Sequence, residues 1–174
     1  MVKKIVISIT GASGYSLGMK VFELLPKGIE KHLILTNHAK VVANYEENIF
    51  VYNESQIEAP ISSGSFGADA MIIAPCSMNT LAKISVGIAD NLTSRVASVM
   101  IKERKTLLLA PRELPLSPIP LENMLKLSQI GVIIAPPIIA YYSEIETLED
   151  MENFIIGKWF DLLNIENNLY KRWE

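Results

Sequence analysis

The chain has 174 residues, of which 49% are hydrophobic and 20% are charged, as expected for one globular domain with a substantial core. Its net charge of -3 gives no overall attraction to nucleic acid or to an anionic membrane, so a phosphate-bearing ligand would need a local basic pocket. The mean hydropathy of +0.26 favours additional apolar surface buried between the subunits of a homo-oligomer.

A single cysteine, Cys76, cannot form an internal disulfide and has no Cys or His companions at metal-ligand spacing. We interpret it as a small buried packing residue rather than a nucleophile. No apolar stretch approaches the ~20 residues of a membrane span, and Gly11 and Ser13 interrupt the short apolar segment that a signal peptide would need. These features predict a cytoplasmic protein.

The first predicted strand covers residues 3–10 and is followed by GASG at 11–14, a tight turn into a helix that begins near Tyr15. Glycines let the backbone approach a ligand closely, and the amides of a helix N-terminus suit a phosphate or an electron-rich ring edge. The spacing G-x-x-G-x-x-x-G differs from the dinucleotide fingerprint, so a nicotinamide dinucleotide is not favoured. A purely structural turn remains the alternative.

Residues 32–36 form the next predicted strand, and a helix is expected over 37–48. His38 at its start is typical of a cap or surface residue. Glu46 and Glu47 at its end are either a solvated pair or carboxylates that reach back to a cofactor. Residues 50–69 are polar and contain SSGSFG at 62–67, which predicts a mobile loop that faces a ligand.

The apolar run 70–74 predicts a buried strand that ends at Pro75, and the polar residues after it supply capping oxygens for a helix over 80–89. A strand that ends at a helix N-terminus is a ready anion or cofactor site. Asp90 is expected to cap a helix over 91–103, which carries Arg95 and Lys102 seven residues apart. Seven residues correspond to ~10 Å of helix rise, so the two cations reach one ligand only if both side chains bend inward.

A further strand is predicted over 105–110, followed by four prolines between Pro111 and Pro120 that predict a stiff loop without helix or central strand. A helix over 121–129, a strand over 132–135 and a helical tail from Thr147 complete the chain. The tail has apolar residues at core spacing: Phe154, Ile155, Trp159 and Leu162.

Strands and helices alternate throughout, which predicts a single α/β domain over residues 1–174 with a three-layer, Rossmann-like, doubly wound and mostly parallel sheet. Such sheets bind ligands at the carboxyl ends of their strands. Arg95, Lys102, Arg112 and Glu113 are expected to gather there.

Nine motifs in order resemble those of the UbiX/Pad1 flavin prenyltransferases, and the likeness runs from residue 3 to about residue 173. They are GASG (11–14), SGSF (63–66), APCSMNTLAKI (74–84), GIADNL (87–92), Arg95, KERK (102–105), PRE-x-PLS (111–117), LENMLKL (121–127) and APP-x-x-AYY (135–142). The chain also ends in Lys171-Arg172-Trp173, which resembles the basic-Trp signature of the family.

The resemblance implies an enzyme that joins the prenyl carbons of dimethylallyl phosphate, or of the diphosphate, to N5 and C6 of reduced FMN. The product is prenylated FMN, the cofactor of UbiD-type decarboxylases. Family members assemble as trimers within a dodecamer, so the helical tail is expected to pack on neighbouring subunits. The chain has no Asp-rich motif of the kind that holds a Mg²⁺-diphosphate, and the resemblance implies a metal-independent reaction.

Site residues follow from the resemblance, position by position. Those expected to bind FMN are Gly11, Ala12, Ser13, Thr36, Ser77, Met78, Asn79, Thr80 and Arg112. Those expected to bind the prenyl phosphate are Arg95, Lys102, Arg112, Tyr142 and Lys158. Those expected to act in catalysis are Ser13, Glu46, Lys102, Glu113 and Tyr142, with Glu46 preferred to Glu47. The chain departs from the family pattern at Tyr15, at Pro120, where many members have His, and at Lys158, where some relatives have Arg.

Two other functions are compatible with a flavin site. The chain could be an FMN-binding accessory subunit of an aromatic-acid decarboxylase, although a pure binder needs no pocket for a leaving phosphate. It could also be a decarboxylase of cysteine-containing peptides, which requires a catalytic histidine, and His38 is the only candidate.

Overall fold

The computed structural model describes residues 2–36, 48–141 and 145–172. Six parallel strands form one sheet in the order β3-β2-β1-β4-β5-β6. The strands are β1 (Lys4–Ile9), β2 (Glu30–Leu35), β3 (Ile49–Asn53), β4 (Ala70–Cys76), β5 (Thr106–Pro111) and β6 (Ile133–Ile134). The winding direction reverses between β1 and β4, so their carboxyl ends flank the crevice where doubly wound sheets bind ligands.

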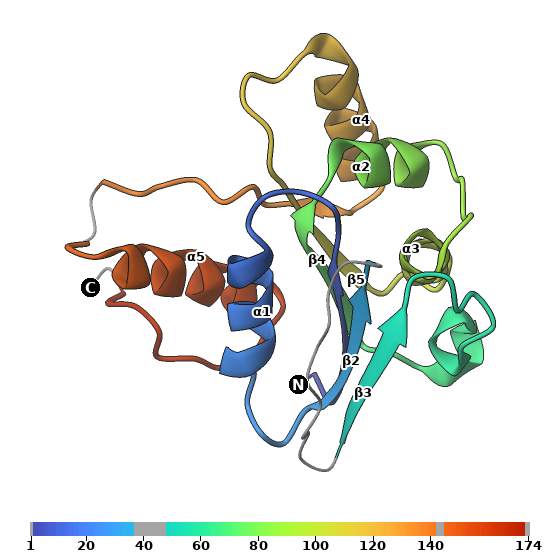
Figure 1. Cartoon of the computed structure of the whole chain (residues 1–174), viewed down its shortest axis with the longest axis horizontal. Helices are drawn as coiled ribbons and strands as arrows, with labels where there is room; N and C mark the ends of the chain where they lie inside the picture. Colours follow the sequence, from blue (N-terminus) through green and yellow to red (C-terminus); the bar gives the residue numbers. More distant parts are fainter. Residues whose placement is uncertain (1, 37–47, 142–144, 173–174) are drawn as a thin grey trace.

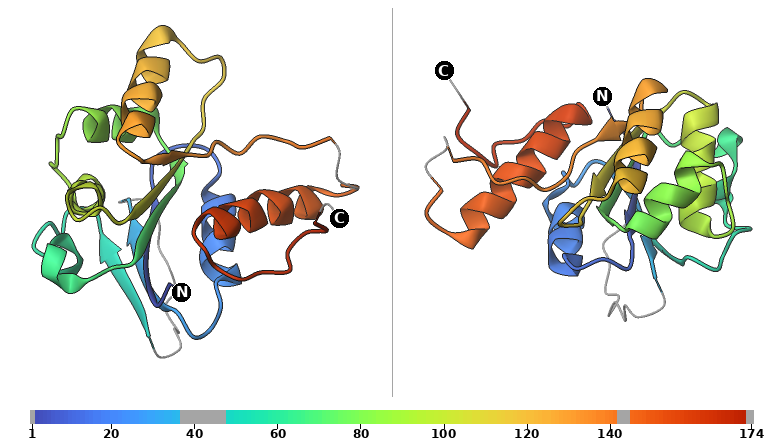
Figure 2. Two further views of the ribbon diagram at one scale, coloured as in Figure 1. Left: turned by 180° about the vertical axis from the view of Figure 1, so that it is seen from behind. Right: turned by 90° about the horizontal axis from the view of Figure 1, so that it is seen from above.

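Helices cover both faces of the sheet and give the expected three layers (Figure 1). They are α1 (Tyr15–Leu24), α2 (Met78–Ser85), α3 (Leu92–Lys102), α4 (Pro118–Gln129) and α5 (Leu148–Leu162), with 3-10 turns at Pro60–Ser62 and Gly64–Phe66. Figure 2 shows α1 and α5 on one side and α2, α3 and the 3-10 turns on the other, while α4 lies beside α2. The predicted doubly wound architecture is confirmed, with every strand pair parallel.

Strand β1 shows why the central strands are apolar along their whole length. Ile5 and Ile7 pack into the cluster beneath α1 and α5, whereas Val6 belongs to the cluster beneath α3. A parallel strand buried on both faces lacks the polar alternation of a surface strand. Ser8 is the buried polar residue of β1, and its hydroxyl is 2.8 Å from the hydroxyl of Thr93 on α3.

Three sequence predictions need correction. The loop expected over 50–69 begins with β3, which pairs with β2 at the sheet edge and leaves Phe50 and Val51 partly exposed. The helix expected over 80–89 ends at Ser85, and Gly87 then adopts a left-handed φ of 76°. Asn91, rather than Asp90, caps α3 by accepting a hydrogen bond from the backbone N–H of Ser94.

The proline-rich segment also contains helix that the sequence argument excluded. Helix α4 begins at Pro118, and Pro120 lies in its first turn. The first N–H groups of a helix have no carbonyl partner within the helix, so prolines there forfeit no hydrogen bond.

Helix α5 buries one apolar face against the sheet layer. In α5, Phe154, Ile155 and Trp159 are buried as expected, whereas Leu162 is 44% exposed. None of the helices in the described ranges combines the length and apolar character that crossing a membrane requires.

Candidate active site at the carboxyl edge of the sheet

The turns that follow β1 and β4 are tied together by one hydroxyl group. Thr10 Oγ1 donates to the carbonyl oxygen of Pro75 at 2.8 Å and accepts from the backbone N–H of Ser77 at 2.9 Å. Thr10 is 5% exposed, and its own N–H is 3.3 Å from the same carbonyl. The resemblance did not indicate Thr10; its only sequence signal is a hydroxyl residue at the end of an apolar strand.

The GASG turn presents backbone and a small hydroxyl at this edge. Gly11 and Ser13 are exposed, and the N–H of Ala12 donates back to the Thr10 carbonyl at 2.7 Å. Gly14 has a φ of 109°, which disfavours a residue with a side chain, and it leads directly into α1. The turn can therefore admit a planar ligand close to its backbone.

Helix α1 enters the crevice unusually close to β4. A β-carbon at Gly18 would lie 2.2 Å from the carbonyl oxygen of Ala74. Glycine at this position brings the helix axis to the strand end, and this contact fixes where the GASG turn lies relative to the turn after β4.

The N-terminus of α2 forms the second half of the edge. Ser77 caps it by accepting from the backbone N–H of Thr80 at 3.2 Å, and the two hydroxyls are 2.9 Å apart. Thr80 is buried, Met78 is half-buried and Asn79 is exposed. The partial positive charge of a helix N-terminus favours a phosphate group here.

Neighbouring strands bring a cation and a further hydroxyl to the same edge. The backbone N–H of Arg112, directly after β5, donates to the Cys76 carbonyl at 3.3 Å, and the side chains of Arg112 and Glu113 are exposed. Thr36 follows β2 and is half-buried. Residues that lie far apart in sequence thus meet at one edge of the sheet.

Cys76 fits the predicted packing role. It is fully buried, and burial raises the pKa of its thiol to about 12. The thiol therefore stays protonated at neutral pH and is a poor nucleophile.

Lys102 lies away from the carboxyl edge of the sheet. It ends α3 next to the start of β5, whereas Arg112 follows the end of that strand, about 20 Å of strand length away. Its ammonium is 3.1 Å from the carboxylate of Glu103. Arg95 is exposed in the first turn of α3, and this turn is joined to the residue after β3 because the backbone N–H of Leu92 donates to the Glu54 carbonyl at 2.7 Å. Within one copy of the chain, Lys102 is therefore far from the carboxyl edge of the sheet, where Arg112 lies.

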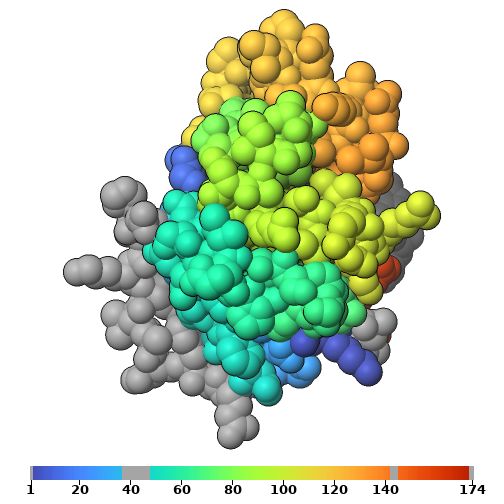
Figure 3. All heavy atoms as spheres, turned by 90° about the vertical axis from the view of Figure 1, so that its right-hand side faces the viewer, coloured from blue at the N-terminus to red at the C-terminus, as the bar shows by residue number. Residues whose placement is uncertain are grey.

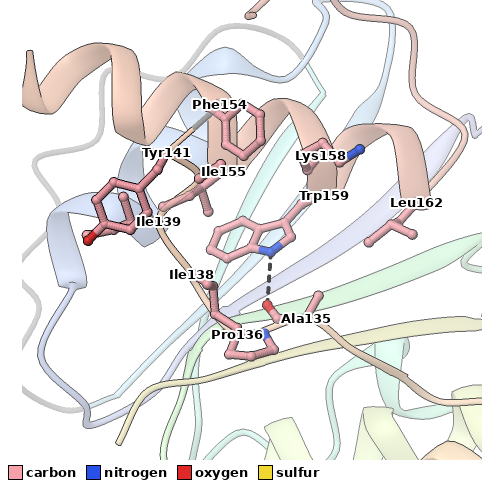
Figure 4. A pocket seen from close by; sticks show the side chains of 11 residues that line it. Ala135, Pro136, Ile138, Ile139, Tyr141, Phe154, Ile155, Lys158, Trp159 and Leu162 are labelled. Atoms are coloured by element: carbon pink, nitrogen blue, oxygen red, sulfur yellow. Dashed lines mark hydrogen bonds between the residues drawn. The ribbon is translucent and has the colours of Figure 1, made fainter. Parts of the chain in front are cut away.

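Lys158 lines an apolar groove between α5 and the extended segment 135–141 (Figure 4). Trp159 fixes this segment to α5 by donating from its indole N–H to the Ala135 carbonyl at 3.0 Å. Tyr141, at the groove's rim, is 92% exposed. The groove thus combines an apolar wall with one ammonium group.

Five residues singled out in the sequence lie outside the described residues: His38, Glu46, Glu47, Tyr142 and Trp173. The helix expected over 37–48 also lies outside them, apart from its last residue. Among the residues that the structure describes, no three His, Cys, Asp or Glu side chains are placed to hold a metal ion.

Comparison with known proteins assigns this chain to a family. The sequence pattern of the flavoprotein family matches residues 1–160. Flavin prenyltransferase UbiX of Helicobacter pylori (strain ATCC 700392 / 26695) is 49% identical, and the match covers 98% of each chain. The UbiX of Methanocaldococcus jannaschii is 41% identical over 98% of each chain. The chain belongs to the UbiX flavin prenyltransferases within the flavoprotein family.

Solved structures of this UbiX family agree with the fold throughout. AnUbiX (PadA1) in complex with FMN and dimethylallyl pyrophosphate is 40% identical and matches with a TM-score of 0.91, covering 100% of this chain and 98% of that one. A dodecameric FMN-dependent UbiX-like decarboxylase from Escherichia coli O157:H7 is 39% identical, with a TM-score of 0.90 over 98% of this chain and 99% of that one. The cypemycin decarboxylase CypD, at 16% identity and a TM-score of 0.60, shares the fold alone.

Proposed function

We propose that this UbiX-family protein is a flavin prenyltransferase that moves a dimethylallyl group from dimethylallyl phosphate to N5 and C6 of reduced FMN. The observation that carries the proposal is the joined pair of turns after β1 and β4, with Arg112 beside them, at the switch point of the sheet. The 49% identity of this chain to a flavin prenyltransferase, over nearly the whole length of both, supports the same reaction.

The residues at the carboxyl edge fit a flavin mononucleotide. The space around Gly11 is open to an added β-carbon, and the exposed GASG turn leaves room for a ring system near Ala12 and Ser13. Ser77, Met78, Asn79 and Thr80 surround the α2 N-terminus, where an FMN phosphate would be stabilised by backbone N–H groups and by Arg112. Thr36 would contact the cofactor from β2. Bound reduced FMN supplies the nucleophilic N5 and C6 atoms.

The protein's own task is to hold the prenyl phosphate and to stabilise its departure. An allylic carbon–oxygen bond ionises more readily when fixed cations neutralise the growing negative charge on phosphate. Arg112 offers a two-pronged donor set, whereas Lys102 and Lys158 act as point charges. Arg95 and Tyr142 would complete the phosphate pocket. Ser13, Glu113 and Glu46 are the proposed residues for proton movement at the flavin's reacting edge.

We propose that this pocket is completed by a second copy of the chain, because in one copy Lys102 and Arg112 lie near opposite ends of β5. Large apolar side chains are exposed along the segments that follow β5 and β6: Leu114 at 88%, Ile119 at 71%, Ile138 at 70% and Tyr141 at 92%. Figure 3 shows α4 projecting at one end of the face formed by α2, α3 and residues 48–69. Burial of these side chains would favour an oligomer, and trimers within a dodecamer are the expected form.

The product, prenylated FMN, is proposed to serve a UbiD-type decarboxylase. The alternative, an accessory FMN-binding subunit without turnover, is less favoured because it requires no cations for a leaving phosphate.

A third function is a decarboxylase of cysteine-containing peptides. The solved structures of such decarboxylases are below 25% identical to this chain and share the fold alone, so they do not support that activity here.

The deciding experiment combines the protein with FMN, a reductant and dimethylallyl phosphate, followed by mass spectrometry of the flavin. We expect a flavin heavier by one dimethylallyl unit. A protein that binds FMN without forming this product would be the accessory subunit instead. Light scattering in the same buffer tests the oligomer, and a monomer mass would contradict the shared pocket.

A further inference from the structure

The C-terminal segment 165–172 folds back along α5 and contacts it at the residue next to Lys158. Asn167 donates from its side-chain amide to the Gly157 carbonyl at 3.3 Å. A β-carbon at Gly157 would lie 2.4 Å from a ring carbon of Tyr170. Glycine in a helix interior is destabilising relative to alanine, so this position gives up helix stability and gains close contact with the Tyr170 ring.

Asp161, one turn beyond Gly157, anchors this returning segment. Its carboxylate accepts from both terminal nitrogens of Arg172 at 2.8 and 2.9 Å, from the hydroxyl of Tyr170 at 2.5 Å and from the amide of Asn167 at 3.0 Å. Because the Arg172 guanidinium, the Tyr170 hydroxyl and the Asn167 amide all donate to it, the carboxylate stays ionised and the ring of Tyr170 is fixed in position.

The ring so fixed lies under the ammonium of Lys158. Lys158 Nζ is 5.8 Å from the Tyr170 ring centroid, within the range of a cation–π contact. Phe154 meets the same ring edge-on, with centroids 5.1 Å apart and planes at 72°. The guanidinium of Arg172 is 5.2 Å from the ring centroid. Tyr170 therefore links the anchored segment to the lysine that lines the groove of Figure 4.

We infer that Tyr170 is a positioning residue for substrate binding: it holds the Lys158 ammonium at the groove, where the phosphate of the prenyl donor is bound. The inference rests on the proposed function for the role of Lys158. A lysine side chain loses much rotamer freedom when it binds an anion, and a ring that already restricts it lowers this cost. Gly157 and Asp161 support this placement: Gly157 leaves space for the Tyr170 ring, and Asp161 binds the Tyr170 hydroxyl.

A double-mutant cycle between Tyr170 and Lys158 tests the inference. We expect Tyr170→Leu to raise the KM for dimethylallyl phosphate about three- to tenfold, the range of one cation–π contact, with FMN binding unchanged. In a Lys158→Ala background the same change should alter KM by less than about twofold. Equal effects in the two backgrounds would overturn the inference, because a general structural defect does not depend on Lys158.

Two companion variants separate ring placement from folding. Tyr170→Phe keeps the ring and loses the hydrogen bond to Asp161. Its KM for dimethylallyl phosphate should therefore rise less than the KM of Tyr170→Leu. Gly157→Ala adds a β-carbon that displaces the ring, so it should raise the KM for dimethylallyl phosphate, while its gain in helix propensity offsets part of the packing that is lost. An unchanged KM in Gly157→Ala would contradict the role of close packing.

A labelling experiment provides a readout that does not depend on turnover. The rate of acetylation of Lys158 by acetic anhydride, measured by mass spectrometry with Lys126 on α4 as internal reference, should rise at least about twofold in Tyr170→Leu, because the ring lies over one side of the amine and limits the access of the reagent. An unchanged ratio would overturn the inference. If the protein instead formed no prenylated flavin while this ratio did rise, the proposed function would fail and the contact between Tyr170 and Lys158 would stand.

Discussion

Thr10 Oγ1 lies 2.9 Å from the backbone nitrogen of Ser77 and donates at 2.8 Å to the carbonyl of Pro75, so one buried hydroxyl joins the carboxyl ends of β1 and β4. These two ends flank the switch point of the sheet. The two halves of the proposed FMN site are therefore held in register by a residue that need not touch the flavin.

Replacing Thr10 with Val tests this relationship. The substitution keeps the shape but removes the acceptor of the Ser77 N–H and the donor to Pro75, so we expect a loss of about 1–3 kcal/mol in the free energy of unfolding and weaker FMN binding. Denaturant unfolding and flavin fluorescence measure the two effects. Thr10→Ser retains the hydroxyl and should recover most of both; a Ser variant as weak as the Val variant would show that the methyl group matters instead.

Gly18 provides a second test of the crevice. Because a β-carbon there would lie 2.2 Å from a backbone carbonyl, Gly18→Ala must push α1 away from β4, at a cost of roughly 1–3 kcal/mol in unfolding free energy. Gly28→Ala is the matched control, since nothing lies within 4 Å of its added carbon, and its effect should stay within about 0.5 kcal/mol. Similar losses in the two variants would contradict the close approach of α1.

The separation of Lys102 and Arg112 leads to a complementation experiment. Lys102→Ala should retain FMN while turnover falls on the order of 100-fold, because the lost charge contacts the leaving phosphate. Loss of FMN binding instead would contradict the role given to Lys102.

Co-expression of Lys102→Ala with Arg112→Ala extends this test to the subunit boundary. If one copy supplies Lys102 and another supplies Arg112, random mixing restores about a quarter of the sites. Mixed oligomers no more active than either parent would place both residues in the same copy.

The anchor at Asp161 has a predictable pH dependence. The Arg172 guanidinium, assisted by the hydroxyl of Tyr170 and the amide of Asn167, lowers the pKa of the Asp161 carboxyl to about 2. The unfolded value is near 3.9, so the stabilisation is present above about pH 4 and is lost as pH falls toward 2. We expect Asp161→Asn to melt below the unmodified protein at pH 7, with the difference shrinking between pH 4 and pH 2. A difference that is constant with pH would contradict the ionised anchor.

The buried thiol of Cys76 offers a test of packing at the end of β4. With its pKa raised to about 12 by burial, it should not react with a disulfide reagent at pH 8 in the native protein. It should react fully once denaturant unfolds the chain. Rapid native labelling would contradict both the burial and the packing role of Cys76.

Local patterns in the sequence determined the fold class and the segments of the candidate site. Continuous apolar runs alternating with amphipathic helices predict a doubly wound sheet, because the period of each pattern follows from backbone geometry alone. The GASG turn and the capping residue Ser77 are likewise local, since each depends on contacts within a few residues. The polar composition of residues 50–69 does not predict β3, because pairing with β2 outweighs local propensity. The prolines do not exclude the first turn of α4, because the first positions of a helix tolerate proline.

Only the tertiary structure decided which of these segments meet. Thr10 reaches Pro75 and Ser77 across 65 and 67 residues of sequence, so no local pattern indicates the contact. Likewise, Arg95 and Lys102 look like one cationic pair along α3, yet the helix runs back toward the start of β5 and carries Lys102 away from the carboxyl edge. Sequence spacing fixes position along an element, whereas position across the sheet depends on strand order, which is set by long-range packing.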